Sequence, residues 1–268
     1  MNYPLPAGFI GFSHIGQKDN QEDSYYPKEN QTGESVSLPL YMVCDGVGGC
    51  ENGEIASATV CQAFADYFQA HPLAADEPMT EVRFNEALQF AYEQLDRKSE
   101  ELGQADMATT LTFVYFHAEG CFVAHIGDSR VYLIRPGEPY PIKFQTWDHS
   151  FINELLRYKD LTQEEIDNHP MRHVITRSIQ PEKRGERCEA DYVNLDFVEP
   201  GDRLFLCSDG VLEKVDNETL ARVLSDDKSP AELMARLETI CEGSYDNYTA
   251  LLVYTDKMPK RKWWQLWK

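Results

Sequence analysis

Apolar and polar positions along the chain repeat with two different periods, which predict helices and strands in separate stretches. Apolar residues recur with a helical period over residues 51–68 and again over residues 80–102. We predict a helix in each stretch. Asn52 and Thr80 are residue types suited to the N-cap of these helices, and Gly103 can end the second one.

Short apolar runs without a helical period predict buried strands. Such runs occupy residues 41–44, 202–207 and 248–255. A further helical pattern spans residues 229–242, and residues 148–169 have the pattern of short helices. Strands and helices therefore both contribute to the predicted core.

Over residues 108–137 the period becomes two, which predicts three strands. Tight turns are expected at Glu119–Gly120 and around Asp128, so we predict an antiparallel meander. No linker divides residues 1–256, and we expect one domain in which helices lie outside two layers of strands. The basic, tryptophan-rich stretch at 257–268 is predicted to be a separate tail.

Charge and cysteine content narrow the function classes. The 268-residue chain has a net charge of -20, which argues against nucleic acid as a partner because phosphate backbones select Lys and Arg. Most of this acidity is interpreted as a solvated surface and the remainder as carboxylates gathered for cations. Seven cysteines without a CxxC pair are typical of reduced thiols in a cytoplasmic core, and no signal peptide or membrane span is expected.

Several aspartates stand at the ends of predicted buried strands. Asp45 follows "YMVC", Asp209 follows "LFLCS", Asp128 follows "FVAHIG", and Asp246 precedes "YTALLVY", while Asp23 lies near the start of the chain. One such aspartate can be a turn or cap residue. Four of them, if they converge, would repel one another strongly unless positive charge were present.

Divalent cations are the simplest source of that charge. A set of oxygen ligands without convergent His or Cys favours Mg²⁺ or Mn²⁺ over zinc. The glycines after Asp45 would leave room for a backbone carbonyl and water near the metal. Two adjacent hard cations can activate water and neutralise phosphoryl oxygens, so the pattern indicates phosphoester hydrolysis.

The motifs together resemble those of a known family. The chain has "KDNQED", "VCDGVGG" followed by "GEIAS", "ATTLTFV", "HIGDSRVY", "HVITRSI", "LFLCSDGV" and "DNYTALLV", in that order. It resembles the compact bacterial members of the PPM-type, or protein phosphatase 2C, metal-dependent protein serine/threonine phosphatases. The resemblance spans about residues 8–255. It implies an α+β fold, a four-layer α/β/β/α sandwich with two central antiparallel sheets.

The resemblance also implies a metal-ligand set. Asp45 would bridge two Mn²⁺ or Mg²⁺ ions, and the carbonyl group of Gly46 would bind one of them. Asp209 and Asp246 would bind the other ion. Asp128 would hold a third ion together with Asp209.

Residues near these ligands are implied by the same resemblance. Glu22 and Asp23 would lie close to the metals and contact them through water. A water bridging the two metals would attack phosphorus directly, without a covalent enzyme intermediate.

Two departures from the family pattern concern the handling of phosphate and protons. Lys18 stands where the family has an Arg that contacts the substrate phosphate, so the charge is kept but the bidentate fork is lost. Gln21 replaces an Asn, a change without a physical interpretation. Val47 stands where eukaryotic members have a His proposed as general acid. Water would then protonate the leaving oxygen.

Histidines elsewhere in the chain are alternative candidates for the acid. His14, His125, His149 and His173 are each better interpreted as surface or packing residues. His173 is the least ordinary of the four, because "HPMRHVITRS" aligns with a flap near the third metal in the family.

Two other function classes stay open at this point. A non-catalytic phosphoprotein-binding module on the same fold would have lost metal ligands, whereas this chain keeps the main acids. An aspartyl-phosphate hydrolase on a parallel sheet would need a second Asp two residues after the first. For the leading function we expect a monomer acting on phosphoproteins and, by family analogy, opposing a serine/threonine kinase.

The tail has its own two interpretations. Trp263, Trp264 and Trp267 would share one face of a helix flanked by Lys and Arg. Such a face could attach the protein to the inner face of the membrane or to a partner. A tail packed on the domain or without fixed structure is the alternative.

Overall fold

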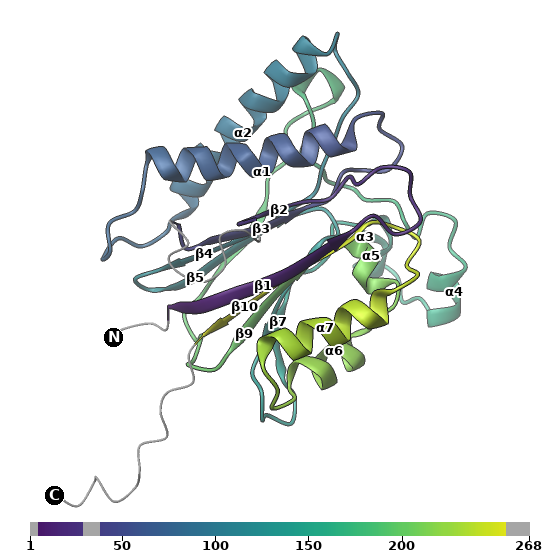
Figure 1. Ribbon diagram of the computed structural model, residues 1–268. Helices are drawn as coiled ribbons and strands as arrows, with labels where there is room; N and C mark the ends of the chain where they lie inside the picture. Colours follow the sequence, from purple (N-terminus) through teal and green to yellow (C-terminus); the bar gives the residue numbers. More distant parts are fainter. Residues whose placement is uncertain (1–4, 29–37, 256–268) are drawn as a thin grey trace, which may run out of the picture.

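Two five-stranded antiparallel sheets face each other in the computed structural model, which describes residues 5–28 and 38–255 (Figure 1). One sheet contains, in spatial order, β1 (Pro6–His14), β10 (Tyr248–Thr255), β9 (Arg203–Cys207), β6 (Arg130–Ile134) and β7 (Ile142–Gln145). The other contains β2 (Ser24–Tyr26), β3 (Leu40–Cys44), β4 (Leu111–His117), β5 (Gly120–Ile126) and β8 (Asp191–Leu195).

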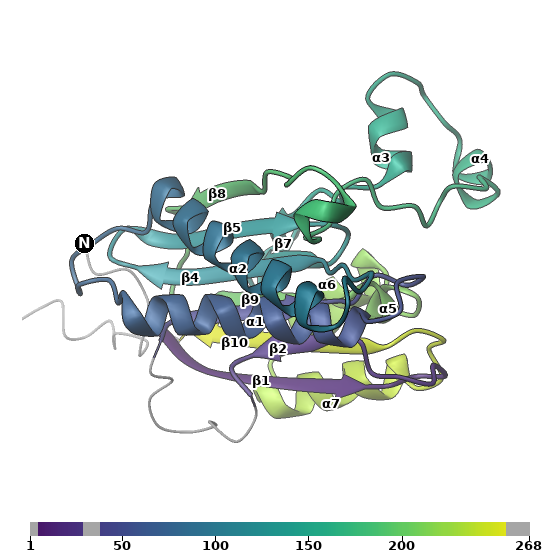
Figure 2. The same ribbon diagram turned by 90° about the horizontal axis from the view of Figure 1, so that it is seen from above.

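Helices cover the outer face of each sheet, as Figure 1 shows. The sheet that contains β3 lies under α1 (Gly53–Ala70) and α2 (Glu81–Glu101), and the other lies over α6 (Asn217–Leu224) and α7 (Pro230–Cys241). The shorter helices are α3 (Phe151–Leu156), α4 (Gln163–Asp167), α5 (Asp209–Leu212) and the 3₁₀ turn Glu182–Arg184. In Figure 2 the segment with α3 and α4 extends beyond the sheets.

Burial on both faces explains why the central strands are apolar throughout. In β3, Met42 packs under the helices while Tyr41 and Val43 pack against the opposite sheet. In β9, Phe205 packs on the helix side and Leu206 between the sheets. Because successive side chains alternate between two apolar layers, no polar position is required. The predicted four-layer α/β/β/α arrangement is confirmed.

The helices begin and end near the predicted residues. Thr80 caps α2 by accepting a hydrogen bond from the Arg83 N–H at 3.3 Å, and Gly103 follows the helix with a positive φ of 74°. Asn52 occupies the N-cap position of α1, but its side chain makes no capping hydrogen bond. Asn52 is therefore the N-cap residue, as predicted, although its side chain does not bond to the first turn of the helix.

The predicted meander over residues 108–137 is wrong in one respect. β4 and β5 pair as expected, but β6 belongs to the other sheet, where it pairs with β9 and β7. The stretch around Asp128 is therefore a crossing between sheets rather than a hairpin turn. Gly127 has a φ of 100°, and a Cβ there would lie 2.6 Å from Thr110 Cγ2, so the crossing requires glycine.

Antiparallel pairing brings the predicted site segments to one end of the sandwich. In one sheet the start of β10 lies beside the ends of β1 and β9, since His14 pairs with Tyr248 and Ala250 with Cys207. In the other sheet, Ser24 pairs with Cys44 at the start of β2. The loops next to these residues contain Lys18, Asp23, Asp45 and Asp246, and Asp209 begins α5 just after β9.

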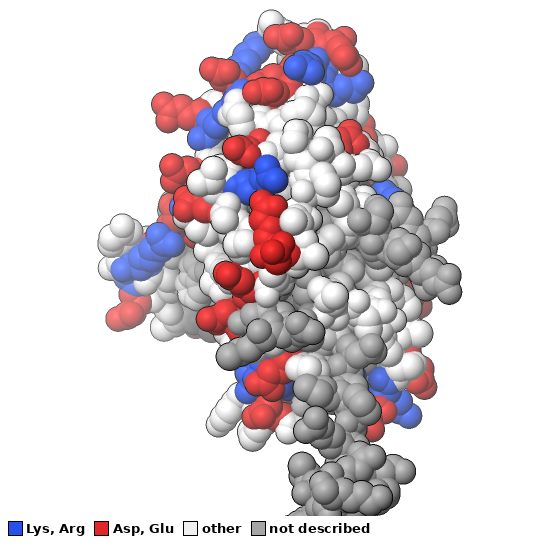
Figure 3. All heavy atoms as spheres, turned by 90° about the vertical axis from the view of Figure 1, so that its left-hand side faces the viewer, with Lys and Arg blue, Asp and Glu red and all other residues white. Residues whose placement is uncertain are grey.

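The surface agrees with the interpretation of the acidity. On the face drawn in Figure 3, acidic side chains are dispersed and basic side chains lie among them. Among the helices of the described residues, none is both long and apolar enough for a membrane crossing. The predicted tail at 257–268 lies outside the described residues, so the division into a domain and a tail stays a prediction.

Candidate metal centre

The main chain of Asp45 is fixed by the two threonines that precede β4, Thr109 and Thr110. Its carbonyl oxygen accepts hydrogen bonds from the Thr110 N–H and the Thr109 hydroxyl, each at 2.8 Å. Its own N–H donates to Thr110 Oγ1 at 3.0 Å. With these groups occupied, the side chain of Asp45 contributes to the wall of a cavity of about 610 Å³.

Most of the sequence-predicted residues meet around this cavity. The predicted residues in its wall are Lys18, Asp45, Gly46, Asp128, His173, Asp209 and Asp246. Six carboxyl side chains line it, against two arginines and one lysine. Glu22 and Asp23 are not part of the wall. The arrangement therefore has an excess of negative charge facing one space.

Electrostatics within the cluster oppose full ionisation. Burial, followed by repulsion from Asp23 and Asp209, raises the pKa of Asp45 well above its usual range. Burial and Asp209 raise the pKa of Asp128 to about 8. The pKa of Asp209 is raised by burial and by Asp246. Among the described residues, the basic side chains near these carboxyls thus do not offset the effects of burial and mutual repulsion on their pKa values.

Asp23 provides an independent test of whether a cation fits. Its Oδ2 accepts a hydrogen bond from Ser208 Oγ at 2.8 Å, whereas Oδ1 is buried without a hydrogen-bond partner among the described residues. Burial raises the pKa of this carboxyl to about 7. A buried carboxylate oxygen without a partner is costly, and a water or cation would satisfy it. The residues present therefore fit hard cations.

Gly46 has a steric role that the sequence did not reveal. A Cβ at Gly46 would lie 2.5 Å from the carbonyl carbon of Gly53, at the start of α1. The glycine therefore permits close approach of the helix in addition to any access for metal and water. The Gly46 N–H donates to the Glu22 carbonyl at 3.1 Å, which also holds Glu22 beside the site.

Asn247 is a positioning residue that the sequence analysis did not identify. Its side chain accepts a hydrogen bond from the Glu22 N–H at 2.7 Å and donates to the carbonyls of Ile15 and Asn20 at 2.7 and 3.0 Å. It is buried beside Asp246 and connects the start of β10 to the loop that contains Lys18. Its place in "DNYT", next to a predicted ligand, was the available signal.

Two of the basic side chains in the cavity wall, Lys18 and Arg130, have acidic partners. Lys18 Nζ lies 2.9 Å from Asp246 Oδ1. Arg130 donates two hydrogen bonds of 2.7 Å to Asp148, a bidentate pair that the sequence did not predict. Lys18 therefore offsets part of the negative charge of the cavity. Its ammonium group is also partly exposed, so it can contact a ligand in the cavity.

The four histidines singled out in the sequence occupy surface or packed positions, as interpreted. His14 is half-exposed and pairs with Glu238 at 2.6 Å. His125 and His149 are buried and hydrogen-bonded. His173 is exposed and is the one histidine in the cavity wall among the described residues. Neither buried ring lies in that wall.

Comparison with known proteins gives concordant matches. The family model described as "Protein phosphatase 2C" matches residues 10–251. Protein phosphatase PhpP of Streptococcus pneumoniae is 31% identical over 248 residues, which cover 89% of this chain and 94% of that protein.

Solved structures agree with these matches. Serine/threonine phosphatase Stp1 of Staphylococcus aureus superposes with a TM-score of 0.78 at 28% identity, covering 96% of this chain and 98% of that chain. The catalytic domain of the phosphatase PstP, in complex with two manganese ions, has a TM-score of 0.71 at 28% identity, covering 93% and 98%.

Proposed function

We propose that this chain hydrolyses its substrates in the cavity at Asp45 by direct attack of water. The chain belongs to the protein phosphatase 2C family and is a metal-dependent protein serine/threonine phosphatase. The observation that supports this location is the convergence of carboxylates whose charge the protein does not balance. The manganese-containing relative supports Mn²⁺ as a cofactor, and Mg²⁺ suits the same ligands.

The proposed ligands are those that the family resemblance implied. Asp45 and the Gly46 carbonyl would hold one cation, and Asp45, Asp209 and Asp246 the other. Asp128, with Asp209, would hold a third. Glu22 and Asp23 would act through water. Two divalent cations, when bound, would acidify a water and neutralise developing charge on the phosphoryl group.

The chain's own side chains would orient the substrate. Lys18 would contact the phosphate oxygens, since its ammonium already lies in the cavity wall. Water attacks phosphorus as the bond to the serine or threonine oxygen breaks. Val47 has no proton to give, so that oxygen would take its proton from water. His173, at the exposed rim, would belong to the flap.

A phosphate-release assay tests this function. We expect the purified chain to release phosphate from phosphoserine and phosphothreonine peptides in Mn²⁺ or Mg²⁺, and far less from a phosphotyrosine peptide of the same sequence. Excess chelator should abolish release, and added Mn²⁺ should restore it. Undiminished release in chelator would contradict the cation site.

The alternative functions are not favoured. A non-catalytic binding module would have lost acidic ligands, whereas Asp45, Asp128, Asp209 and Asp246 all lie around one cavity. An aspartyl-phosphate hydrolase on a parallel sheet is contradicted by the antiparallel pairing of every strand pair described. The relatives named as phosphatases support the enzyme.

Partners and location extend the proposal. Phosphorylated proteins are the substrates, and we infer a monomer whose activity opposes a serine/threonine kinase. Trp263, Trp264 and Trp267 lie outside the described residues, and their role as an anchor or docking peptide stays a proposal. Sedimentation with anionic vesicles checks it: deletion of residues 258–268 should abolish binding, and unchanged binding would contradict an anchor.

A further inference from the structure

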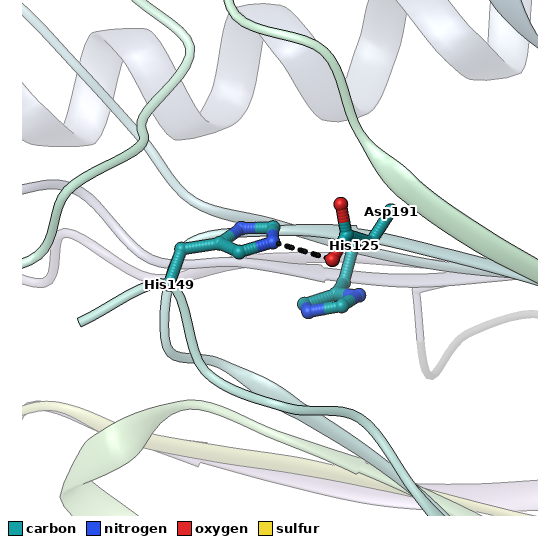
Figure 4. Close-up of side chains that lie close together, drawn as sticks. All are labelled: His125, His149 and Asp191. Carbon is teal, nitrogen blue, oxygen red and sulfur yellow. Dashed lines mark ion pairs between the residues drawn. The ribbon is translucent and has the colours of Figure 1, made fainter. Parts of the chain in front are cut away.

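A second group of metal-ligand side chains lies beside the loop that contains Asp128. His125, His149 and Asp191 bring one ligand atom each to within 4.8 Å of one another (Figure 4). The two rings stack with centroids 4.5 Å apart. Two imidazoles and a carboxylate are the composition of many zinc sites, so the group has to be examined as a cation site.

Hydrogen bonds assign the ring protons in a way that does not suit a cation. The Gly127 N–H donates to His149 Nδ1 at 3.1 Å, so the neutral ring has its proton on Nε2. That proton is then donated to Asp191 Oδ2 at 3.2 Å. In His125, Nε2 donates to the Trp147 carbonyl at 2.9 Å. Both Nε2 atoms therefore present protons.

Arg177 supplies the positive charge that a cation would otherwise bring. Its Nη1 donates to Asp191 Oδ1 at 2.7 Å and lies 3.3 Å from His149 Nε2. The carboxylate of Asp191 thus accepts from both neighbours, and the group contains one negative and one positive charge. A cation here would face a guanidinium and the N–H group of His149.

His149 instead connects three parts of the molecule. Its N–H donates to the Gly127 carbonyl at 2.9 Å, and its ring accepts from the Gly127 N–H. Its carbonyl accepts from the Thr176 N–H at 2.8 Å, in the segment that follows α4. Its ring donates to Asp191 in β8. Both main-chain groups of Gly127 are therefore held by one residue.

Gly127 precedes Asp128, and this loop needs support. The Asp128 side chain shares the cavity wall with the carboxyl groups of Asp148 and Asp209. The loop crosses between sheets, so no strand ladder continues through it. The two bonds to His149 restrain the loop before Asp128, and the hydrogen bond between Ser129 and Thr110 restrains it after Asp128.

We propose that His149 is a positioning residue that holds Asp128 in place for cation binding through Gly127, with its tautomer fixed by the Gly127 N–H and Asp191. The inference rests on the proposed role of Asp128. It predicts that the ring's Nδ1 acceptor matters to the cation site more than its Nε2 donor does.

Two variants separate the two nitrogens. In His149→Asn the amide oxygen can stand in for Nδ1 and accept from Gly127. In His149→Gln the longer amide reaches toward Asp191 but leaves Gly127 without its acceptor. Mn²⁺ binding, measured by titration calorimetry, should weaken about tenfold at one site in His149→Gln and less than threefold in His149→Asn.

Controls distinguish this inference from the role of Asp128 and from loss of folding. Asp128→Ala should remove the same site, and His149→Gln should then have no additional effect. Circular dichroism monitors folding. If His149→Gln does not fold, His149→Leu, which fills the space without an acceptor, should give the same loss.

The outcomes that overturn the inference are distinct. If Asp128→Ala removes no Mn²⁺ site, the role of Asp128 fails and the positioning role fails with it. If that site is lost but the Asn and Gln variants bind Mn²⁺ equally, positioning through Gly127 is wrong. Zn²⁺ binding that disappears in His125→Phe would show that the group is a cation site.

Discussion

The cavity at Asp45 and the group around His149 contain similar ligand atoms but differ in charge balance. In the cavity, carboxylates outnumber the basic side chains, and the pKa of Asp45 is raised by burial and by its acidic neighbours. Around His149, Arg177 pairs with Asp191, and each assigned ring proton has an acceptor. The presence of ligand-type residues is therefore a weaker sign of a cation site than uncompensated charge.

The largest expected effect comes from removing a ligand of the unbalanced cavity. Asp209→Ala should lower phosphate release by about 10²–10³-fold or more, because a group that supports charge stabilisation in the transition state is lost. The matched control is Asp226→Ala, which removes a surface pair with Arg236 and should change activity less than twofold. Equal activities for the two variants would contradict the proposed centre.

The free energy of unfolding should change in opposite directions when one acid is neutralised in the cavity and one in the group around His149. In metal-free protein at pH 8, Asp128→Asn should raise the free energy of unfolding by about 1–3 kcal/mol, since it removes a carboxyl whose pKa is raised to about 8. Asp191→Asn should lower it by about 1 kcal/mol, because Arg177 loses its charged acceptor. Urea unfolding in chelator measures both, and changes of the same sign would refute the contrast.

The free energy of unfolding should depend on pH through His149 in the group of His125, His149 and Asp191. Burial, followed by His125, lowers the pKa of His149 to about 4. The unfolded chain, with an ordinary histidine pKa near 6.5, binds more protons between these values. His149 therefore contributes stability above about pH 6.5 that is lost as pH falls toward 4, by about 1–2 kcal/mol. His149→Asn should flatten this slope in urea unfolding measured from pH 4 to 7, and an unchanged slope would exclude His149 as its source.

The smallest expected effect concerns Lys18, whose ammonium group lies in the cavity wall. Lys18→Arg should lower KM for a phosphopeptide by about threefold to tenfold, the gain of one charge-assisted hydrogen bond reduced by competition from Asp246. Steady-state kinetics with Lys18→Gln as the charge-removing control provides the measure. An unchanged KM in the Arg variant would indicate that Lys18 does not contact phosphate.

Sequence periodicity predicted strand positions better than strand partners. The strand over residues 248–255 has the predicted bounds, and both long N-terminal helices were located. The placement of β6 was not predictable in this way, because alternation describes which faces of a strand are buried and not which strand lies beside it. The short strands β2 and β7 lack a run long enough for a periodic signal.

The candidate site was predictable where its residues belong to motifs. Asp45, Asp128, Asp209 and Asp246 lie together as the strand ends suggested. Thr110 and Asn247 act through buried hydrogen bonds to main-chain groups, and such bonds depend on the final packing of distant segments. The interpretation of His149 as a packed residue is confirmed, but its bonds to Gly127 required the folded loop.

The position of the proposed cation centre between the two sheets has a mechanical consequence. Asp45 follows β3 of one sheet, and Asp209 follows β9 of the other. A cation shared by these two side chains would link the two sheets at this end of the sandwich, in addition to the hydrogen bond between Ser208 and Asp23. A displacement of one sheet relative to the other would then separate the ligands. Catalytic activity would therefore depend on the alignment of the two sheets.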